Sequence, residues 1–349
     1  SIAESKAGQK FRKSILQECD LLEVLTLPEG LFHSQIETLA LVARKRESQR
    51  ITVPVTTVRE LKSRDLPRFA QSAVFTRTYS VGLDRWSGDA ESRFVISPLL
   101  DLWERLEKMH EPLGKVAEVR AGLKVKAGDT TSVHDTRQSG DVAFLDRKDV
   151  LKPFALLMKG ERSDQWLSYG DHLERPRTAA TFDPAKVLVN SNRNPGSPWR
   201  LVAAMAPAKL YYSFSFHGVF TRPGSDCSLE MLTAVLNSPL ANAWFDAHSR
   251  KRWIHVPTLE RLPLPQVDNA MAGRIATRVE LLADATRRKW QSNRREGRGL
   301  FDDDGESPST EVSMLLSELD DLVFLAYGLT TSERRAIQRL MIGERRPGQ

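Results

Sequence analysis

The sequence predicts a mixed α+β protein in three parts: a closing α/β piece, a β-rich domain and a helical C-terminal region. Three observations carry this prediction. The first 50 residues hold an amphipathic segment followed by two apolar runs. Residues 113–221 are short apolar runs separated by irregular loops, and beyond residue 265 apolar residues recur at helical spacing. We place the boundaries at 1–95, 96–265 and 266–349, because 349 residues suffice for more than one domain.

The N-terminal segment predicts a helix followed by a β-hairpin. A helix over residues 5–19 places four apolar residues on one side: Phe11, Ile15, Leu16 and Cys19. The runs 21–27 and 36–42 are β-leaning, and Pro28-Glu29-Gly30 supplies a turn after the first. Both runs are apolar at nearly every position, so we expect the hairpin to be buried on both faces.

A helix and two strands cannot cover their own apolar faces. We therefore expect residues 1–50 to be the last piece of an α/β domain, and the chain to be a C-terminal fragment of a longer protein. Residues 51–95 hold another β run, ITVPVTTV, and are expected to form a connector with some local structure. A helix should open at Ser97-Pro98 and end at Glu111-Pro112. Its apolar positions are Leu99, Leu102, Trp103, Leu106 and Met109.

The middle of the chain is dominated by predicted strands. Their sequences are KVAEVRAGLKV, DVAFL, LKPFALLM, KVLVNSN, WRLVAAMA and KLYYSFSFHGVFT. An apolar helical stretch follows over residues 228–248 and leads to Arg250, Lys251 and Arg252, directly before Trp253. Three adjacent cations repel one another, so this run suits a phosphate backbone with a flanking base or sugar. The alternative is an ordinary solvated loop.

The C-terminal region predicts three helices. The first includes Met271, Ile275, Val279, Leu282 and Ala283 and extends to Trp290. A loop over residues 294–310 is expected to be mobile. Two helices, 311–327 and 332–342, should follow, with Ser332 as the N-cap of the second.

Composition excludes several classes of protein. The two cysteines, Cys19 and Cys227, cannot build a disulfide framework or a zinc site, and the seven histidines are scattered, so no metal site is expected. No apolar run reaches the length of a membrane span, and the polar N-terminal segment lacks a signal-peptide pattern. We therefore expect a cytoplasmic protein without membrane contact.

The positive charge is concentrated in the middle of the chain. The net charge is +6, and residues 111–265 contain 21 basic and 16 acidic residues. Residues 1–110 contain 17 and 15, and residues 266–349 contain 13 and 14. This distribution favours a polyanionic partner for the β-rich part.

The order of several segments resembles gamma-class N6-adenine DNA methyltransferases of restriction-modification and phage-exclusion systems. QKFRKSILQECDLLEVLTLPEGLF and IETLALVARK resemble their closing αββ segment, which ends a Rossmann-like methyltransferase fold. PLGKVAEVRAGL, DRKDVLKPF, VLVNSN with WRLVAAM, and LTAVLNSPLANAWFDAHSRKRWIHVPTLERLPLP resemble the target-recognition domain that follows it. LDDLVFLAYGLTTSE is similar to the helical tail of large fused methylases.

The resemblance implies a division of labour within a longer enzyme. In this family a glycine-rich loop binds S-adenosyl-L-methionine, and an Asn-Pro-Pro-Tyr/Phe loop holds an adenine that has been flipped out of double-stranded DNA. Both motifs are absent from this sequence. The resemblance therefore implies that the missing N-terminal catalytic region supplies methyl transfer. The chain itself is expected to be inactive, without bound cofactor and without catalytic residues.

The resemblance also assigns candidate binding residues. Phe32 matches a position that stacks on the flipped adenine; the alternative is that Phe32 anchors the hairpin core. From residue type and position we predict phosphate contacts from Lys124, Lys126, Arg250, Lys251 and Arg252. The predicted base-reading residues are Asn192, Arg193, Asn194 and Arg200. Trp253 is equally suited to DNA contact and to packing, and His217 is expected to be structural.

Two rival functions remain open at this point. One is a non-catalytic DNA-specificity subunit of a type I restriction-modification complex, which would have no need of the N-terminal αββ segment. The other is a protein-interaction module that uses the helical tail, and it would require no DNA affinity. The alternatives differ in whether the chain binds DNA and in what lies upstream of it.

Overall fold

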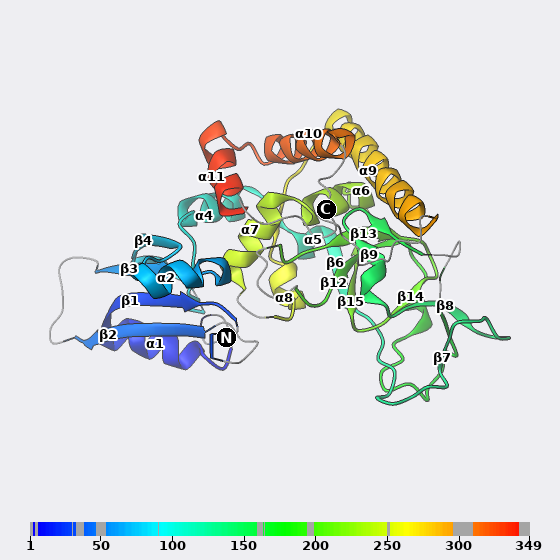
Figure 1. The fold of residues 1–349 in the computed structure, drawn as a ribbon, viewed down its shortest axis with the longest axis horizontal. Helices are drawn as coiled ribbons and strands as arrows, with labels where there is room; N and C mark the ends of the chain where they lie inside the picture. The colour runs from blue at the N-terminus through cyan, green and yellow to red at the C-terminus, as the bar shows by residue number, and fades with distance from the viewer. Residues whose placement is uncertain are drawn as a thin grey trace. The chain divides into compact units, whose positions relative to one another are not determined.

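The chain forms two compact units in a computed structural model (Figure 1). The structure describes residues 3, 6–29, 31–32, 38–46, 54–89, 91–158, 163, 165–193, 199–249, 252–295 and 310–341. The first unit comprises Ser1–Glu104, Asn194–Ser197 and Phe245–Arg252. The second comprises Arg105–Arg193, Pro198–Trp244 and Trp253–Gln349.

A four-stranded mixed sheet organises the first unit. Its strand order is β2-β1-β3-β4, and the strands are β1 (Cys19–Leu27), β2 (Thr38–Lys45), β3 (Val55–Glu60) and β4 (Arg77–Gly82). β1 and β2 form the predicted antiparallel hairpin, whereas β1 and β3 are parallel. The helices of this unit are α1 (Gln9–Glu18), α2 (Leu66–Ser72), α3 (Asp84–Ser87) and the start of α4 (Leu100–Met109), with a 3-10 turn at Ser63–Asp65.

Two expectations about this unit are wrong. The hairpin is not buried on both faces: β2 is the edge strand, every residue in it is at least partly exposed, and Val42 is among the exposed apolar side chains. The ITVPVTTV run does not belong to a connector, because its described part begins β3 inside the sheet. β3 alternates between buried and less buried positions, as expected for a strand with one covered face.

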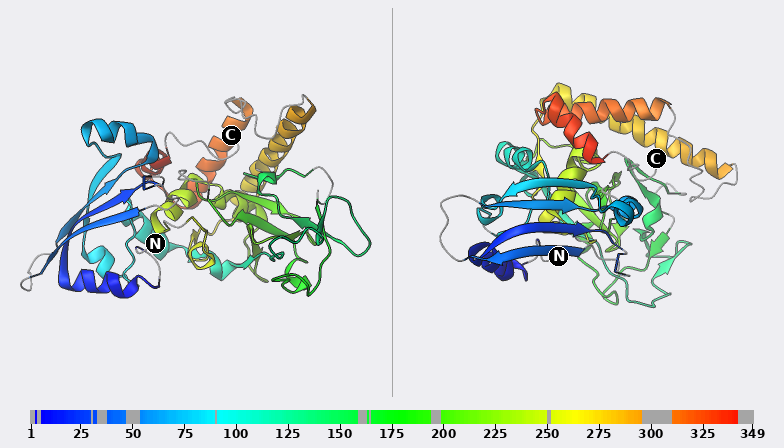
Figure 2. Two further views of the ribbon diagram at one scale, coloured as in Figure 1. Left: turned by 60° about the horizontal axis from the view of Figure 1, so that its bottom comes forward. Right: turned by 60° about the vertical axis from the view of Figure 1, so that its left-hand side comes forward.

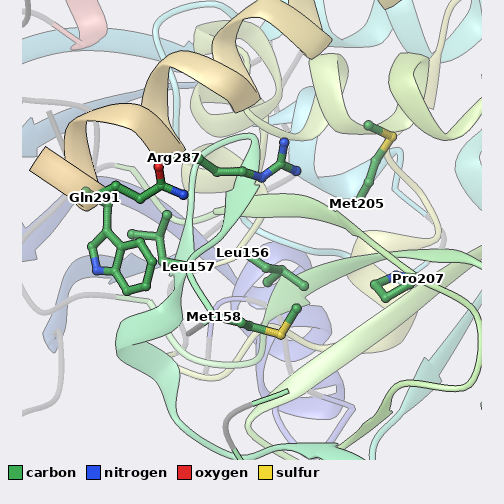
Figure 3. Close-up of a pocket in the computed structure, with 8 residues that line it drawn as sticks. Leu156, Leu157, Met158, Met205, Pro207, Arg287 and Gln291 are labelled. Atoms are coloured by element: carbon green, nitrogen blue, oxygen red, sulfur yellow. The ribbon is translucent and has the colours of Figure 1, made fainter. Parts of the chain in front are cut away.

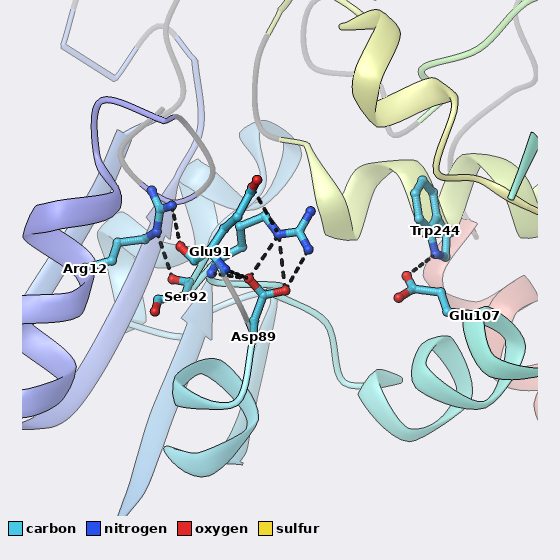
Figure 4. Close-up of polar contacts among 7 residues, drawn as sticks. Arg12, Asp89, Glu91, Ser92, Glu107 and Trp244 are labelled. Carbon is cyan, nitrogen blue, oxygen red and sulfur yellow. Dashed lines mark hydrogen bonds and ion pairs between the residues drawn. The ribbon is translucent and has the colours of Figure 1, made fainter. Parts of the chain in front are cut away.

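The buried face of α1 differs from the predicted one. Leu16 packs in the core with Leu21 and Val24, but Phe11 is exposed and Arg12 is fully buried. The Arg12 guanidinium donates hydrogen bonds to the backbone oxygens of Ser92 (2.8 Å) and Glu91 (2.9 Å), as Figure 4 shows. A buried arginine is stable when such acceptors satisfy it. Arg12 therefore holds the segment after α3 against α1.

The second unit contains two four-stranded sheets and two small two-stranded ones. The first large sheet has the order β13-β12-β15-β6, and the second has the order β14-β8-β11-β7. The strands of the first are β6 (Ala117–Ala121), β12 (Lys186–Asn190), β13 (Ala203–Ala206) and β15 (Phe216–Thr221). Those of the second are β7 (Val133–His134), β8 (Val142–Leu145), β11 (Gln165–Leu167) and β14 (Tyr211–Tyr212). The small sheets pair β9 (Leu151–Lys152) with β10 (Ala155–Leu156), and β5 (Glu111–Pro112) with β16 (Pro263–Leu264).

Two predicted strands are each divided. LKPFALLM forms β9 and β10 around a turn in which Phe154 has a φ of 69°, and the Phe154 amide donates to Ala203 O at 2.9 Å. KLYYSFSFHGVFT forms β14 and β15, separated by a turn at residues 213–215. Each run is apolar enough to form a single strand, but hydrogen bonds to residues far away in the sequence hold a turn in the middle of it.

The helices of the second unit follow the predicted positions. α6 (Leu229–Leu236) begins at Ser228, whose side chain accepts from the Met231 amide at 3.1 Å. α7 (Pro239–His248) has its first residues, up to Trp244, in the second unit and the others in the first. α5 (Leu113–Val116) and α8 (Val256–Leu259) are short. The 3-10 turns of the second unit include Lys148–Val150 and Ala179–Thr181. α6 and α7 are buried on nearly every face, beyond the predicted apolar stripe.

The C-terminal helices are α9 (Asn269–Arg295), α10 (Thr310–Ala326) and α11 (Thr331–Met341), and Figure 2 shows α9 and α10 beside one another. The N-cap of α11 is Thr330, which corrects the prediction of Ser332. Thr330 N donates to Glu333 at 2.8 Å, and Glu333 N donates to the Thr330 hydroxyl at 3.3 Å. The buried Tyr327 hydroxyl donates to Pro263 O at 2.6 Å, which ties α10 to β16. The predicted loop at 294–310 falls mostly outside the described residues.

Two further features of the second unit bear on its chemistry. Trp244 donates from its indole nitrogen to Glu107 at 2.9 Å (Figure 4). A cavity of about 330 Å³ lies where Arg287 and Gln291 of α9 face Leu156, Met158 and Met205 (Figure 3). Among the described residues that line it, most side chains are apolar, and none is an acid, base or nucleophile suited to catalysis.

Candidate nucleic-acid interface

Several predicted DNA-binding residues of the second unit lie where three strands of one sheet end or begin. The C-terminal ends of β6 and β12 lie beside the N-terminal end of β15, since Asn190 pairs with Phe216 and His217 pairs with Ala121. The segments that leave these strands are residues 122–126, 190–193 and 213–215, and residues 253–254 join them. We call these four segments together the strand-end surface.

Backbone hydrogen bonds connect the four segments directly. Phe214 N donates to Leu123 O at 2.7 Å, and Ser191 N donates to Ser215 O at 2.9 Å. Ile254 N donates to Ser191 O at 2.8 Å. Each segment of the strand-end surface is therefore held by a neighbouring one, which gives the surface a defined shape.

Gly122 permits the close approach of two of these segments. A Cβ atom at Gly122 would lie 2.1 Å from Ser213 O and 2.5 Å from Tyr212 O. Real Cβ atoms do not approach a carbonyl oxygen so closely, so only glycine allows residues 122–126 to lie against the 213–215 turn. The position of the Lys124 and Lys126 loop thus depends on a residue without a side chain.

His217 positions the segment that contains Trp253. Its Nε2 lies 2.8 Å from Ile254 O, which assigns the ring proton to Nε2 as the donor. Burial lowers the pKa of His217, because a charged imidazolium would be desolvated there. The expected structural role of His217 agrees with these contacts, and Trp253 pairs with Asn192 in an isolated antiparallel bridge.

The cations of the strand-end surface differ in their partners. Lys126 is exposed and, within the described chain, makes no ion pair. Lys124 forms an ion pair with Glu174 at 2.6 Å. Exposed ion pairs are weak, so DNA phosphates can compete with the Glu174 carboxylate for Lys124. Arg252 belongs to the first unit and is not part of the strand-end surface; its side chain is exposed.

The structure describes three of the four predicted base-reading residues. Arg193 and Arg200 are buried, with 3% and 1% of their surfaces exposed, and a base edge cannot reach them in this conformation. The Asn192 side-chain oxygen is also buried, and it has no hydrogen-bond partner among the described residues. Asn192 therefore cannot accept from an adenine amino group without turning. Asn194, Arg250 and Lys251 lie outside the described residues.

The half-buried Asn190 and the fully buried Asn242 hold residues 200–202, which lead into β13. Asn190 donates to Asn192 O (2.6 Å) and Arg200 O (2.9 Å), and its side-chain oxygen accepts from Val202 N (2.7 Å). Asn242 of α7 accepts from the amides of Arg200 and Leu201 at 2.7 and 2.8 Å. These contacts fix the base of the loop, which makes Arg200 part of the support and not of the exposed surface.

Phe214 is a candidate contact residue that the sequence analysis missed. It lies in the turn between β14 and β15, beside Leu123, and 42% of its surface is exposed. Trp253 is 48% exposed. The strand-end surface thus combines lysines with two exposed aromatic rings, a combination that suits phosphate contact together with base or sugar stacking. Phe214 sits inside an apolar run, and that run alone predicts a buried strand residue.

Phe32 belongs to the first unit. It follows β1 at the start of the hairpin turn, and 60% of its surface is exposed. The alternative that Phe32 anchors the hairpin core is therefore wrong. An exposed ring is available for stacking, and stacking on a flipped adenine stays a prediction.

Among the described residues no group of three or more His, Cys, Asp or Glu side chains is placed to hold a metal ion. None of the described helices has the length and apolar character needed to cross a bilayer.

No family model and no curated protein matches the sequence. The type IIL restriction-modification enzyme MmeI, solved in complex with DNA, matches with a TM-score of 0.53 and 10% identity over 97% of this chain and 48% of MmeI. At this identity the match shows a shared fold.

Two other solved structures match more weakly. The type IIG restriction endonuclease BpuSI matches with a TM-score of 0.40 and 12% identity over 93% of this chain and 46% of BpuSI. The HsdS subunit from Thermoanaerobacter tengcongensis matches with 0.33 and 11%, over 65% and 50%. The chain spans about half the length of each of these three proteins.

Proposed function

We propose that this chain is the DNA target-recognition part of an S-adenosylmethionine-dependent adenine-N6 methyltransferase of a restriction-modification or phage-defence system. The observation that supports the proposal most is the fold similarity to MmeI, a restriction-modification enzyme solved with DNA, over 97% of this chain. The strand-end surface adds an independent argument, because its lysines and exposed aromatic rings suit double-stranded DNA.

The proposed roles separate affinity from chemistry. Lys126 and Arg252 contact phosphates, and Phe214 and Trp253 contact bases or sugars exposed at the groove. Methyl transfer from S-adenosyl-L-methionine is assigned to a catalytic region outside these 349 residues. Phe32 is the residue of this chain that reaches the target adenine.

Salt-dependent DNA binding tests the recognition proposal. We expect the 349-residue chain to bind a fluorescent duplex in anisotropy titrations, with affinity that falls between 50 and 200 mM salt. Lys126→Ala should reduce the slope of log K against log salt by about 1, because one phosphate contact is lost. Trp253→Ala should weaken binding by about tenfold with little change in slope, because stacking contributes about 1–3 kcal/mol per base.

The matched control is Lys289→Ala, which removes an exposed cation from α9. Its affinity and slope should equal those of the unaltered chain. Absence of salt-dependent duplex binding by the unaltered chain contradicts the proposed function. The protein-interaction alternative predicts that absence.

Phe32→Ala separates adenine stacking from duplex binding. In the complete protein, we expect this variant to slow adenine methylation by about tenfold or more while duplex affinity changes less than twofold, since stacking acts only on the flipped base. Single-turnover methylation with labelled S-adenosyl-L-methionine measures the first quantity, and anisotropy measures the second. Equal losses in both, or no methylated adenine from the unaltered protein, would contradict the role of Phe32.

A further inference from the structure

A polar groove of about 630 Å³ lies along β6, apart from the predicted DNA-binding residues. One wall consists of residues 118–121 of β6, and the other consists of residues 177–181. Its lining residues are Glu118, Val119, Arg120, Ala121, Arg177, Thr178, Ala180 and Thr181. Small and hydroxylated side chains leave the guanidinium groups accessible.

The charge balance of this groove favours an anion. Arg120 donates two hydrogen bonds to Glu118, at 2.8 and 2.7 Å, so these two charges largely offset each other. Arg177 is exposed, and no described carboxylate pairs with its side chain. Arg222 interacts electrostatically with Glu118 and adds a further positive charge nearby. The groove lining therefore carries a net positive charge.

The backbone presents Arg177 in an uncommon conformation. Its φ is 59°, in the left-handed region that residues other than glycine rarely adopt. The Tyr169 hydroxyl donates to Arg177 O and holds the segment there. The Thr178 and Thr181 hydroxyls, 3.0 Å apart, hydrogen-bond to each other at the groove wall. A phosphate oxygen can accept from either hydroxyl once that mutual bond opens.

The groove is connected to the strand-end surface. β6 forms a wall of the groove and continues directly into residues 122–126. Lys124 also forms a backbone bridge with Arg175, two residues before Arg177, with hydrogen bonds of 3.0 and 3.1 Å in both directions. Cations on these segments can therefore contact one continuous polyanionic strand that passes from the groove to the strand-end surface.

We propose that this groove binds backbone phosphates of the same DNA duplex that contacts the strand-end surface, with Arg177 as the main phosphate ligand. Glu118 limits the affinity, because its carboxylate occupies Arg120 and repels phosphates. The inference rests on the proposed DNA-recognition function and adds a second contact region to it. Contacts to phosphates are independent of base sequence, so the groove contributes to positioning and not to site choice.

Loss of Arg177 tests the phosphate contact. Arg177→Asn is the suitable variant, because asparagine tolerates the left-handed conformation. We expect duplex affinity to fall by about fivefold at 100 mM salt, with a slope of log K against log salt reduced by about 1. The loss should be the same for duplexes of unrelated sequence. An unchanged affinity and slope would overturn the assignment of Arg177.

Removal of the Glu118 carboxylate is a second test of the groove, because it should raise the affinity for duplex DNA where loss of Arg177 lowers it. Glu118→Gln releases Arg120 and removes repulsion, so duplex affinity should rise by about threefold and the salt slope should steepen. The matched control is Glu318→Gln, which makes the same change of charge. It releases Arg278 of α9, whose Nε lies 2.5 Å from the carboxylate of Glu318 in α10. The control should change affinity less than twofold. Misfolding cannot produce tighter binding, so a gain specific to Glu118 supports the groove directly.

The outcomes distinguish the groove from the proposed function. If the unaltered chain binds duplex DNA and Lys126→Ala weakens it, while the Arg177 and Glu118 variants match their controls, the groove proposal alone is overturned. Equal gains from Glu118→Gln and Glu318→Gln also overturn it, because they reflect net charge only. If the unaltered chain shows no salt-dependent binding, both proposals fail.

Discussion

Replacing Asn242 by alanine is expected to lower the free energy of unfolding by about 3 kcal/mol or more. Asn242 is fully buried and forms four hydrogen bonds. It accepts from the Arg200 and Leu201 amides, and it donates to Leu236 O (3.3 Å) and Ser238 O (3.0 Å). The alanine variant leaves two buried amides without an acceptor, and each unsatisfied group costs about 1–3 kcal/mol.

Chemical denaturation at constant pH measures this loss. Asn269→Ala is the matched control, because Asn269 is exposed at the start of α9 and should change the free energy of unfolding by less than about 0.5 kcal/mol. The Asn242 variant should also weaken duplex binding, because the strand it holds closes the loop after residues 190–193. A destabilisation below about 1 kcal/mol would show that water replaces the lost acceptor.

Replacing Lys186 by methionine is expected to stabilise the protein by about 1–3 kcal/mol at pH 7. Lys186 has no exposed surface, and its ammonium donates to Phe182 O at 2.7 Å. That oxygen also accepts from Lys209 N at 3.0 Å, so the variant leaves it satisfied. Methionine keeps the length of the side chain and packs well beside the rings of Tyr212 and Phe220, which flank the ammonium.

The pH dependence of stability identifies the cause. Burial lowers the pKa of Lys186 from 10.5 to about 8, against an opposing attraction from Asp183. Between these values the folded state binds fewer protons than the unfolded state, so this residue makes stability rise with pH. The free-energy cost of burying the charged Lys186 is fully present below about pH 8 and is absent above about pH 10.5. The difference between the two pKa values corresponds to about 3 kcal/mol of stability.

The Lys186→Met gain should therefore shrink as pH rises through this window. Denaturation curves at pH 7 and pH 10 for both proteins measure the difference. Lys209→Met is a useful comparison, since Lys209 is exposed and this variant removes the same charge from the surface. A destabilised Lys186 variant at pH 7 would mean that the ammonium contributes more through its contacts than burial costs.

Local patterns in the sequence determined most of the secondary structure. The helices α1, α4, α6, α7, α9, α10 and α11 and the β1–β2 hairpin lie close to their predicted positions. Apolar spacing and helix-terminal residues act within a few positions of one another, so they can be read from the chain alone. The mixed α+β class followed from the order of these elements. The accumulation of positive charge in the middle of the chain was likewise a property of sequence.

Only the tertiary structure decided which side chains are accessible. Phe11 and Arg12 are neighbours on α1, yet the arginine is buried because distant backbone oxygens accept from it. Arg200 is buried, whereas Phe214, in an apolar run, is exposed at a turn. These outcomes depend on strand register and on hydrogen bonds between residues far apart in sequence, which no local pattern encodes.

Pairing between strands far apart in the sequence also explains the candidate interface. The sequence by itself determined that lysines, arginines and aromatic residues occur in loops of the β-rich part. The antiparallel pairing of β6, β15 and β12 decided that several of those loops meet at one edge, and the fold around β6 decided that Arg120 and Arg177 line one groove. Pairing between strands about 30 residues apart (β12 and β15) and about 100 residues apart (β6 and β15) is set by packing of the whole unit, so this surface became visible only in three dimensions.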